Sequence, residues 1–468
     1  MSLADEFGID LKKNEVQSDF IEYDLDTGKP KILVTASVDY MLGLYHTMVD
    51  PVKKIMYIYN EEKGTYQLDY GSAIENQFIG LFGDLLTPSL ISTLKFHIFR
   101  TPKYQVETSP EMWMHSDILN FKNGVYNIKE QKLYPHSHEY KFISQIGTKY
   151  DPDARCPNID RAMKNIFTDD QILKEFEWLG FCLTSGYAYK LISIYCGATN
   201  CGKSTYFNIV SKMMGEDNLS QLEPQDISKE FYLINLYGKM LNIAGDVGAH
   251  TISGFNKIKE LTGLDKIIAN VKGQPMVSFR NQAKLMWGCN RLPNFDDTNE
   301  ATYGRIRQID CEKVINPKDI DSFDMNDYTS EEELSGLLNH ALEGLKRLTE
   351  RGHFELPTIE ERISKHENSA NSFFNWADEN LTFTSLNEDR IHGDELYNNY
   401  RLWCKENGVI NVQSSGSFLR DFKKNMHKKY IKYTAFKMNG EKKRGVIGCK
   451  FFDAEESPEE GVRNWMDK

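Results

Sequence analysis

The sequence predicts an α/β fold with a parallel central sheet, preceded by a mixed α+β module and followed by a small winged-helix domain. Strand-like and helix-like segments alternate from residue 191 to residue 310, an order typical of a parallel sheet covered on both faces. Upstream, residues 31–150 mix amphipathic helices with short strands. Downstream, residues 367–468 contain three helix-like segments and then a two-stranded ribbon, which is the order of a winged helix.

Composition and length describe a globular protein with more than one core. The 468 residues suggest about three domains, and a hydrophobic content of 40% argues against a disordered chain. No apolar run approaches the ~18 residues of a membrane span, and the first ten residues lack signal-peptide features, so we expect a cytoplasmic location. We expect an α+β module at 1–157, a helical collar at 158–190, a core with a helical lid at 191–366 and a winged-helix domain with an acidic tail at 367–468.

Net charge and cysteine spacing exclude several classes of protein. A net charge of −12 argues against a protein that coats nucleic acid over its whole surface, but it leaves room for a few local basic elements. The eight cysteines are scattered without a C-x-x-C pair. This spacing indicates reduced thiols, and neither a disulfide framework nor a zinc site.

The N-terminal module and the collar are predicted from periodicity. Apolar residues at helical spacing predict helices over residues 70–86 and 91–100. Asn123-Gly124 lies between two short apolar stretches, which is a hairpin signal. Two further helices are expected at 159–167 and 172–183, before the core begins.

A glycine-rich segment marks the start of the core. It reads Gly197-Ala198-Thr199-Asn200-Cys201-Gly202-Lys203-Ser204-Thr205 and matches G-x-x-x-x-G-K-[ST]. A strand-like run precedes it and a helix-like run follows it, as a phosphate-binding loop requires. Lys203 would reach the β- and γ-phosphates, and the Ser204 hydroxyl would bind Mg²⁺. The alternative, a chance glycine turn, does not account for the lysine, the hydroxyl and the strand together, so the sequence predicts binding of ATP with Mg²⁺.

Two later strand-like runs end in polar residues. Residues 239–245 lead to Asp246, whose carboxylate would hold Mg²⁺ directly or through water. Residues 284–289 lead to Asn290, whose amide can orient an attacking water against the γ-phosphate. The alternatives are that Asp246 caps a following helix and that Asn290 is a turn residue.

Together these segments resemble the superfamily 3 helicases, in particular the poxvirus- and phage-type primase-helicases. Residues 255–265 are similar to the additional motif of that family, K-x-L-T-G-x-D, and residues 285–293 are similar to its sensor strand, which ends in N-R-L-P. Residues 123–126 and 150–157 resemble the module that precedes such helicase cores. The resemblance covers residues 112–311 well and the C-terminal region loosely.

The resemblance implies an AAA+-like subunit of a ring, usually a hexamer, that translocates on single-stranded DNA. Each nucleotide would lie between neighbouring subunits, and a basic residue of the next subunit would complete the site. Arg305 is the first candidate for this residue and Arg307 the second. Related proteins often carry two adjacent arginines here, whereas Gly304 precedes Arg305. The second ATPase motif has one acid where many ATPases have two, so it does not identify a general base.

The resemblance also assigns DNA contacts to a hairpin. Residues 267–271 and 276–279 are strand-like, with residues 272–275 as the turn. Family members place the tip lysine, here Lys272, on the DNA backbone in the ring channel. Such a contact would have no base preference and would weaken with added salt. The alternative is an exposed turn lysine with no partner.

Basic residues gather on the third helix and the ribbon of the predicted winged helix. They are Arg420, Lys423, Lys424, Lys428 and Lys429, then Lys437, Lys442, Lys443 and Arg444. A helix in the major groove with a wing along the backbone would use both groups. A solvated face that binds a partner protein or the acidic tail is the alternative.

These features favour an ATP-dependent, ring-forming DNA helicase in the replication of a phage, virus or mobile element. Its expected partners are single-stranded and forked DNA, further copies of the chain, and a separate primase or polymerase. One alternative is an origin-binding initiator that uses ATP as an assembly switch and unwinds little DNA itself. Another is a monomeric small-molecule P-loop kinase whose ATPase is indifferent to DNA.

Overall fold

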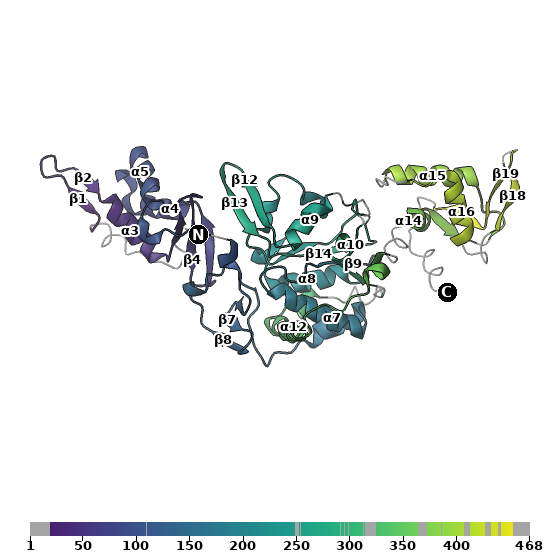
Figure 1. Cartoon of the computed structure of the whole chain (residues 1–468), viewed down its shortest axis with the longest axis horizontal. Helices are drawn as coiled ribbons and strands as arrows, with labels where there is room; N and C mark the ends of the chain where they lie inside the picture. Colours follow the sequence, from purple (N-terminus) through teal and green to yellow (C-terminus); the bar gives the residue numbers. More distant parts are fainter. Residues whose placement is uncertain are drawn as a thin grey trace. The chain divides into compact units, whose positions relative to one another are not determined.

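The computed structural model describes residues 19–108, 110–248, 252, 254–290, 292–293, 295–297, 299–311, 313, 324–363, 372–384, 386–406, 412–425, 432–438 and 441–452. Contacts divide the chain into two compact units. The larger unit comprises residues 1–245, 256–288 and 305–355, and the smaller one comprises residues 246–255, 289–304 and 356–468. Figure 1 labels many of the elements described below. In the described residues, no helix combines the length and the apolar character needed to cross a bilayer.

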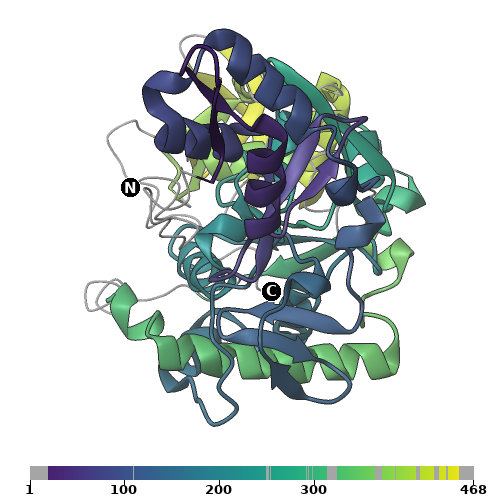
Figure 2. The same cartoon turned by 90° about the vertical axis from the view of Figure 1, so that its left-hand side faces the viewer.

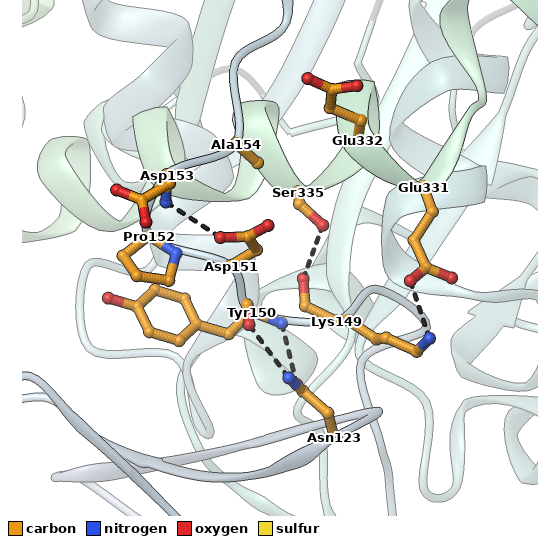
Figure 3. A pocket seen from close by; sticks show the side chains of 10 residues that line it. All are labelled: Asn123, Lys149, Tyr150, Asp151, Pro152, Asp153, Ala154, Glu331, Glu332 and Ser335. Atoms are coloured by element: carbon orange, nitrogen blue, oxygen red, sulfur yellow. Dashed lines mark hydrogen bonds and ion pairs between the residues drawn. The ribbon is translucent and has the colours of Figure 1, made fainter.

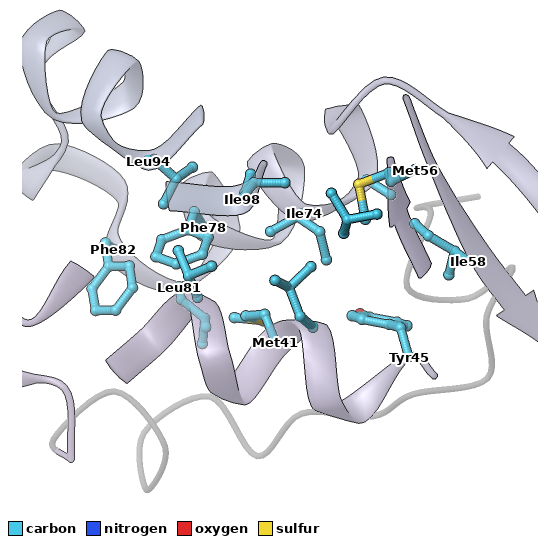
Figure 4. Close-up of a cluster of buried hydrophobic side chains, with 14 of the residues drawn as sticks. Met41, Tyr45, Met56, Ile58, Ile74, Phe78, Leu81, Phe82, Leu94 and Ile98 are labelled. Atoms are coloured by element: carbon cyan, nitrogen blue, oxygen red, sulfur yellow. The ribbon is translucent and has the colours of Figure 1, made fainter. Parts of the chain in front are cut away.

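The larger unit begins with a small α+β layer. Its elements are β1 (Ile21–Tyr23), β2 (Pro30–Ile32), α3 (Val34–Leu44), β3 (Met48–Asp50), β4 (Ile55–Asn60), β5 (Thr65–Asp69), α4 (Ser72–Phe82) and α5 (Pro88–Ile98). The three helices turn side chains such as Met41, Phe78 and Leu94 into one apolar cluster, which Figure 4 shows. Thr87 begins α5 because its side chain accepts a hydrogen bond from the Leu90 backbone N–H. The two helices predicted between residues 70 and 100 are confirmed as α4 and α5.

The predicted hairpin and the two helices before the core are also present. Strands β6 (Ile118–Phe121), β7 (Gly124–Asn127) and β8 (Lys132–Tyr134) form an antiparallel sheet. Helices α6 (Pro157–Ile166) and α7 (Asp169–Leu183) follow. Thr168 starts α7 with a reciprocal capping box to Gln171.

A five-stranded parallel sheet forms the core, as predicted. Its strands are β9 (Ile192–Cys196), β10 (Leu219–Ser220), β11 (Leu241–Ala244), β14 (Lys284–Cys289) and β15 (Ile306–Asp310), in the order β10-β11-β14-β9-β15. Helices α8 (Lys203–Met214), α9 (Phe255–Thr262) and α10 (Glu300–Tyr303) connect them, and β12 (Lys266–Val271) with β13 (Gln274–Arg280) forms a separate hairpin. Every residue of β9, β11 and β14 is buried, which fits a sheet covered on both faces.

A long helix, α12 (Glu331–Arg351), packs along α7 and appears in green, side-on, in Figure 2. The two helices approach closely because small residues lie at the contact. A Cβ at Gly180 would collide with the backbone of Ala341 and Leu345. This helix and the helical residues 359–363 lie within the part of the chain, residues 191–366, where a helical lid was predicted. Residues 364–366 lie outside the described residues.

The C-terminal part of the smaller unit has its own core. It contains α14 (Ser372–Asn380), β16 (Leu381–Phe383), β17 (Arg390–His392), α15 (Gly393–Glu406), α16 (Ser415–Asn425), β18 (Lys432–Met438), β19 (Glu441–Ile447) and β20 (Cys449–Phe451). The three helices and the β18–β19 ribbon match the predicted order, and β17 pairs with β19 as a third strand that was not predicted. Trp376, Tyr400 and Phe418 pack in the centre. Residues 428–429, the 439–440 turn and the acidic tail lie outside the described residues.

Candidate nucleotide-binding site

The glycine-rich loop connects β9 to α8 at the carboxyl end of the central sheet. Its residues Ala198, Thr199 and Asn200 are exposed. Gly202 has a φ of 88°, which glycine adopts without steric cost, and it leads directly into the first residue of α8. Gly197 must also be glycine, because a Cβ there would lie 2.5 Å from the carbonyl oxygen of Cys311. The loop therefore presents its backbone and the start of α8 to solvent, as an anion site requires.

Lys203 supplies the positive charge of this loop. Its side chain is largely buried, and Nζ donates to the carbonyl oxygens of Gly197 and Ala198, the latter at 3.1 Å. It also lies 3.3 Å from Sγ of Cys201. Ser204, the next residue, is exposed at the same helix start. An incoming phosphate oxygen would replace the two carbonyls as the partner of the ammonium group.

Cys201 gives the loop an unusual thiol. A hydrogen bond from the Cys311 thiol and the charge of Lys203 lower the pKa of the Cys201 thiol, against the opposing effect of burial. The same hydrogen bond and burial raise the pKa of Cys311. All eight cysteines are free and buried in this structure.

A buried polar network connects the elements that flank the loop. The Glu175 carboxylate on α7 accepts hydrogen bonds from the hydroxyls of Tyr195 at 2.6 Å and Tyr206 at 2.7 Å. It also forms an ion pair with Arg307 at 2.6 Å, and Arg307 donates to Ser193 Oγ at 2.9 Å. One carboxylate thus ties α7, β9, α8 and β15 together around the loop.

The sequence motifs did not point to this network. A signal was present, because Glu175 interrupts an apolar helical stripe between Ile172 and Leu179. An acid at such a position needs a buried partner, since an unpaired buried charge is very costly.

Arg307 is therefore wrong as a second candidate for a residue that acts in a neighbouring site. Its side chain is only 2% exposed. Burial lowers the pKa of the guanidinium, but the charge of Glu175 outweighs this effect and raises the pKa above its usual value. Arg305 is half-buried and its Nε donates to Thr262 Oγ1 at 3.0 Å. Burial lowers the pKa of Arg305, and Asp265 partly offsets this. Thr262 and Asp265 both belong to the K-x-L-T-G-x-D segment, so the first candidate arginine contacts the additional motif of its own chain.

The other two predicted catalytic residues follow neighbouring strands. Asp246 comes two residues after β11, and Asn290 directly follows β14; both are exposed. The ends of β11 and β14 lie very close together, because a Cβ at Gly288 would come within 2.5 Å of the Gly245 carbonyl oxygen. Parallel strands end at one edge of a sheet, which is the edge that carries the glycine-rich loop.

The β12–β13 hairpin carries its lysine at the tip, as predicted. Val271 pairs with Gln274, so Lys272 and Gly273 alone form the turn. The predicted four-residue turn is wrong, because Gln274 and Pro275 already belong to β13. Lys272 is exposed, and so are Ile268 and Met276, at 62% and 61%. The hairpin thus exposes a cation and apolar side chains together.

The C-terminal basic residues are on the surface where they are described. Arg420 and Lys423 on α16 are exposed, and Lys423 Nζ lies 4.2 Å from the ring centre of Tyr433. Lys442, Lys443 and Arg444 on β19 are exposed, and Lys443 pairs with Asp394 at 3.7 Å. Lys437 on β18 is exposed too. The side chain of Lys424 lies outside the described residues.

Two stretches of the chain match known families. Residues 52–168 match the family described as "D5 N terminal like", and residues 195–307 match a family of unknown function named DUF5906. The second match runs from β9 through β15 and so contains the whole glycine-rich loop.

A relative and several solved structures are also similar. Primase D5 of Fowlpox virus (strain NVSL) is 24% identical over 226 residues, which cover 44% of this chain and 28% of that protein. Two structures of the C-terminal region of NrS-1 align with TM-scores of 0.49 and 0.44, at 13% and 15% identity, over 89% and 88% of this chain and 99% and 98% of theirs. The D5-like match and the viral primase show that part of this chain is similar to a poxvirus primase. The chain spans little more than a quarter of that relative.

Proposed function

We propose that this chain is an ATP-dependent DNA helicase that forms a ring, usually of six subunits, and acts in phage, viral or mobile-element replication. The observation that carries this proposal is the glycine-rich loop at the edge of a five-stranded parallel sheet, with Lys203 held inside it. A site of this kind has the backbone amides, the charge and the helix start that bind a nucleoside triphosphate.

In this proposal each polar residue around the loop has one role. Lys203 neutralises the β- and γ-phosphates, and Ser204 holds Mg²⁺ together with Asp246. Asn290 orients the attacking water. The ends of β11 and β14 at the loop edge support these roles, because residues that follow them leave the sheet on the nucleotide side.

Arg305 completes the site of a neighbouring subunit in the proposed ring. In the single chain it is bonded to Thr262 and lies near Asp265. Ring assembly would redirect this guanidinium to the γ-phosphate of the adjacent nucleotide, where it stabilises the charge of the transition state.

DNA would be held at two places. The exposed hairpin with Lys272 at its tip contacts the backbone of single-stranded DNA in the ring channel. The C-terminal part, with its three helices and β18–β19 ribbon, acts as a winged helix whose residues Arg420, Lys423, Lys443 and Arg444 contact duplex or forked DNA.

The decisive experiment measures the mass of the chain in solution and its activity under the same conditions. With ATP, Mg²⁺ and single-stranded DNA we expect a ring that hydrolyses ATP and separates a forked duplex. Lys203→Ala should reduce ATP hydrolysis by at least about a hundredfold, because the main cation at the phosphates is removed. Lys212→Ala, on the exposed face of the same helix, is the matched control. A chain that stays monomeric under every condition and still hydrolyses ATP at full rate would exclude a ring motor.

A mixing experiment tests the place of Arg305. Arg305→Ala and Lys203→Ala should each be inactive alone. Mixed rings should regain part of the ATPase activity, because an intact loop from one variant meets an intact arginine from the other. Mixed rings that form without recovering any activity would show that Arg305 does not act on the neighbouring site.

A second candidate function is an ATP-switched, origin-binding initiator. The exposed basic side chains on α16 and β19 favour it, because such a surface can read one duplex sequence. Footprinting on replication-origin DNA distinguishes the two functions. Strong protection of one site with little strand separation supports the initiator, and sequence-independent binding with efficient unwinding supports the helicase.

A further inference from the structure

Three potential metal ligands meet between α6 and α12, apart from the nucleotide site. They are Cys156 at the start of α6, Asp160 in its first turn and His340 on α12. Each offers one ligand atom, and these atoms lie within 4.8 Å of one another. Cys156 Sγ is 3.6 Å from Asp160 Oδ1, and His340 Nε2 is 3.3 Å from the same oxygen.

The two separations to the Asp160 oxygen are close to the edges of a tetrahedral zinc site. Zinc bonds of about 2.3 Å to sulfur and about 2.0–2.1 Å to nitrogen and oxygen place neighbouring ligand atoms about 3.3–3.5 Å apart. Sulfur, imidazole and carboxylate together are the donor set that zinc accepts. We infer that Cys156, Asp160 and His340 bind one Zn²⁺ ion through three protein ligands, with a water molecule as the fourth.

The surroundings hold the ligands in place before any metal arrives. The Glu333 carboxylate on α12 accepts hydrogen bonds from the backbone N–H groups of Asn158 and Ile159, both at 3.0 Å. Gly336 lets the backbone of α12 touch that of Arg155 and Cys156. The ring of Phe176 stacks on His340 with centroids 4.5 Å apart, which fixes the imidazole orientation.

Further contacts anchor the segment just before Cys156. Ser335 donates to the carbonyl oxygen of Lys149 at 2.8 Å, and Lys149 pairs with Glu331 at 2.7 Å, as Figure 3 shows. Asn339 bonds to the carbonyl oxygens of Asp151 and Ala154. The chain from residue 149 to residue 160 is therefore pinned to α12, and the ligands come from rigid elements.

The charge and access of the cluster also suit a cation. The Asp160 carboxylate beside Cys156 would attract Zn²⁺, and the thiol proton would pass to solvent as the sulfur–zinc bond forms. Cys156 is buried, while the side chains of Asp160 and His340 are 43% and 33% exposed, so the ion can enter from that side.

The proposal predicts a role that is separate from ATP hydrolysis. The ion would link the start of α6 to α12 and stabilise the folded chain, since a ligand that binds only the folded state adds to stability. Cys156 and His340 are far apart in the sequence, so a search for zinc-finger spacing does not identify them.

Cobalt titration of the full-length chain, first treated with a chelator, tests the site. One equivalent of Co²⁺ should produce a thiolate-to-cobalt charge-transfer band with tetrahedral visible bands, and Zn²⁺ should displace it. Cys156→Ser should abolish the charge-transfer band. His340→Gln should weaken metal binding by more than about a hundredfold, which exceeds the usual loss from an outer partner. His353→Gln, which changes an exposed histidine beyond α12, should bind metal like the parent.

Unfolding curves measured without metal distinguish variants that have lost only a metal ligand from variants that fold less stably. His340→Gln and Asp160→Asn alter partly exposed side chains, so their metal-free unfolding midpoints should stay close to that of the parent. Zn²⁺ should raise the midpoint of the parent and not those of these variants. A titration without a charge-transfer band, or a band that survives Cys156→Ser, would overturn the assignment, because the metal would then bind elsewhere or not at all.

Discussion

Two regions of the larger unit carry a lysine that we assign to phosphate, and they hold it in opposite ways. Lys203 is buried in its loop, where backbone carbonyls and a thiol surround the ammonium group. Lys272 is exposed at a two-residue turn on a hairpin that also exposes Ile268 and Met276. The first site is organised within one chain. In our proposal, the second is a surface that becomes a site only when DNA or further subunits cover it.

The contacts that hold the segments around Lys203 and Lys272 in place also differ. Under the glycine-rich loop, Glu175 connects four elements through Arg307 and two tyrosines. The hairpin is held by fewer polar contacts between described residues: Arg280 at its base donates to the carbonyl oxygen of Leu264, and Asn270 donates to the Glu230 carboxylate at 3.2 Å. In our proposal the loop needs fixed geometry for catalysis.

Removing the cation that pairs with Glu175 should have the largest effect on the free energy of unfolding. Arg307→Met leaves the Glu175 charge buried without its cation, and such a change costs about 3–5 kcal/mol of unfolding free energy. Urea unfolding followed by circular dichroism measures this directly. Arg305→Met, just before the same strand, is the control, and it should cost much less because Arg305 is only half-buried.

A double variant checks the cause. Glu175→Gln with Arg307→Met removes both charges and keeps an oxygen acceptor for Tyr195 and Tyr206, so it should be more stable than Arg307→Met alone. If the double variant is the less stable of the two, packing and not an uncompensated charge explains the destabilisation.

A third lysine, which is buried without a carboxylate partner among the described residues, should make the stability of the protein depend on pH. Lys284 on β14 is fully buried, and burial lowers its pKa to about 7, against about 10.5 in the unfolded chain. Between these values the unfolded chain binds more protons, so the stability of the parent should rise with pH, by at most about 1.4 kcal/mol per pH unit. Below pH 7 the folded state must bury a charge, and this cost is fully present.

Lys284→Met removes this dependence. The variant should be more stable than the parent near pH 6, and the difference should shrink toward pH 9. Thermal unfolding at pH 6, 7, 8 and 9 measures it, with the exposed Lys266→Met as the control. An equal difference at every pH would mean that Lys284 stays charged in the folded protein, with the Thr184 carbonyl and the Phe181 ring as sufficient partners.

Local sequence patterns predicted the helices and strands, whereas long-range contacts determine which side chains are buried and which residues they pair with. The strand before residue 197, the helix after Lys203 and the hairpin with Lys272 at its tip are each set by neighbours in the sequence, and all three are present. Arg307 was misread because the motif gives a position along the chain and not the burial of a side chain. Its place in a parallel strand covered on both faces was a usable signal, since a charged residue there must be paired. The Glu175 network and the Cys156 cluster join elements that are far apart in the sequence. A local pattern can show that Glu175 or Arg307 needs a buried partner, but it cannot show which residue that partner is.

The smallest expected effect is on the hairpin. Lys272→Ala should leave the DNA-independent ATPase activity unchanged and should weaken binding to single-stranded DNA by about tenfold, because each subunit then has one fewer cation on the phosphate backbone. The slope of log K against log salt should become less steep by about 0.7 for each phosphate that is no longer neutralised. Fluorescence anisotropy at several salt concentrations measures both quantities. Lys266→Ala, at the base of the same hairpin, is the matched control and should bind DNA like the parent. A drop in ATPase activity without DNA in Lys272→Ala would place this lysine in the nucleotide cycle, and the contrast between the two lysines would then fail.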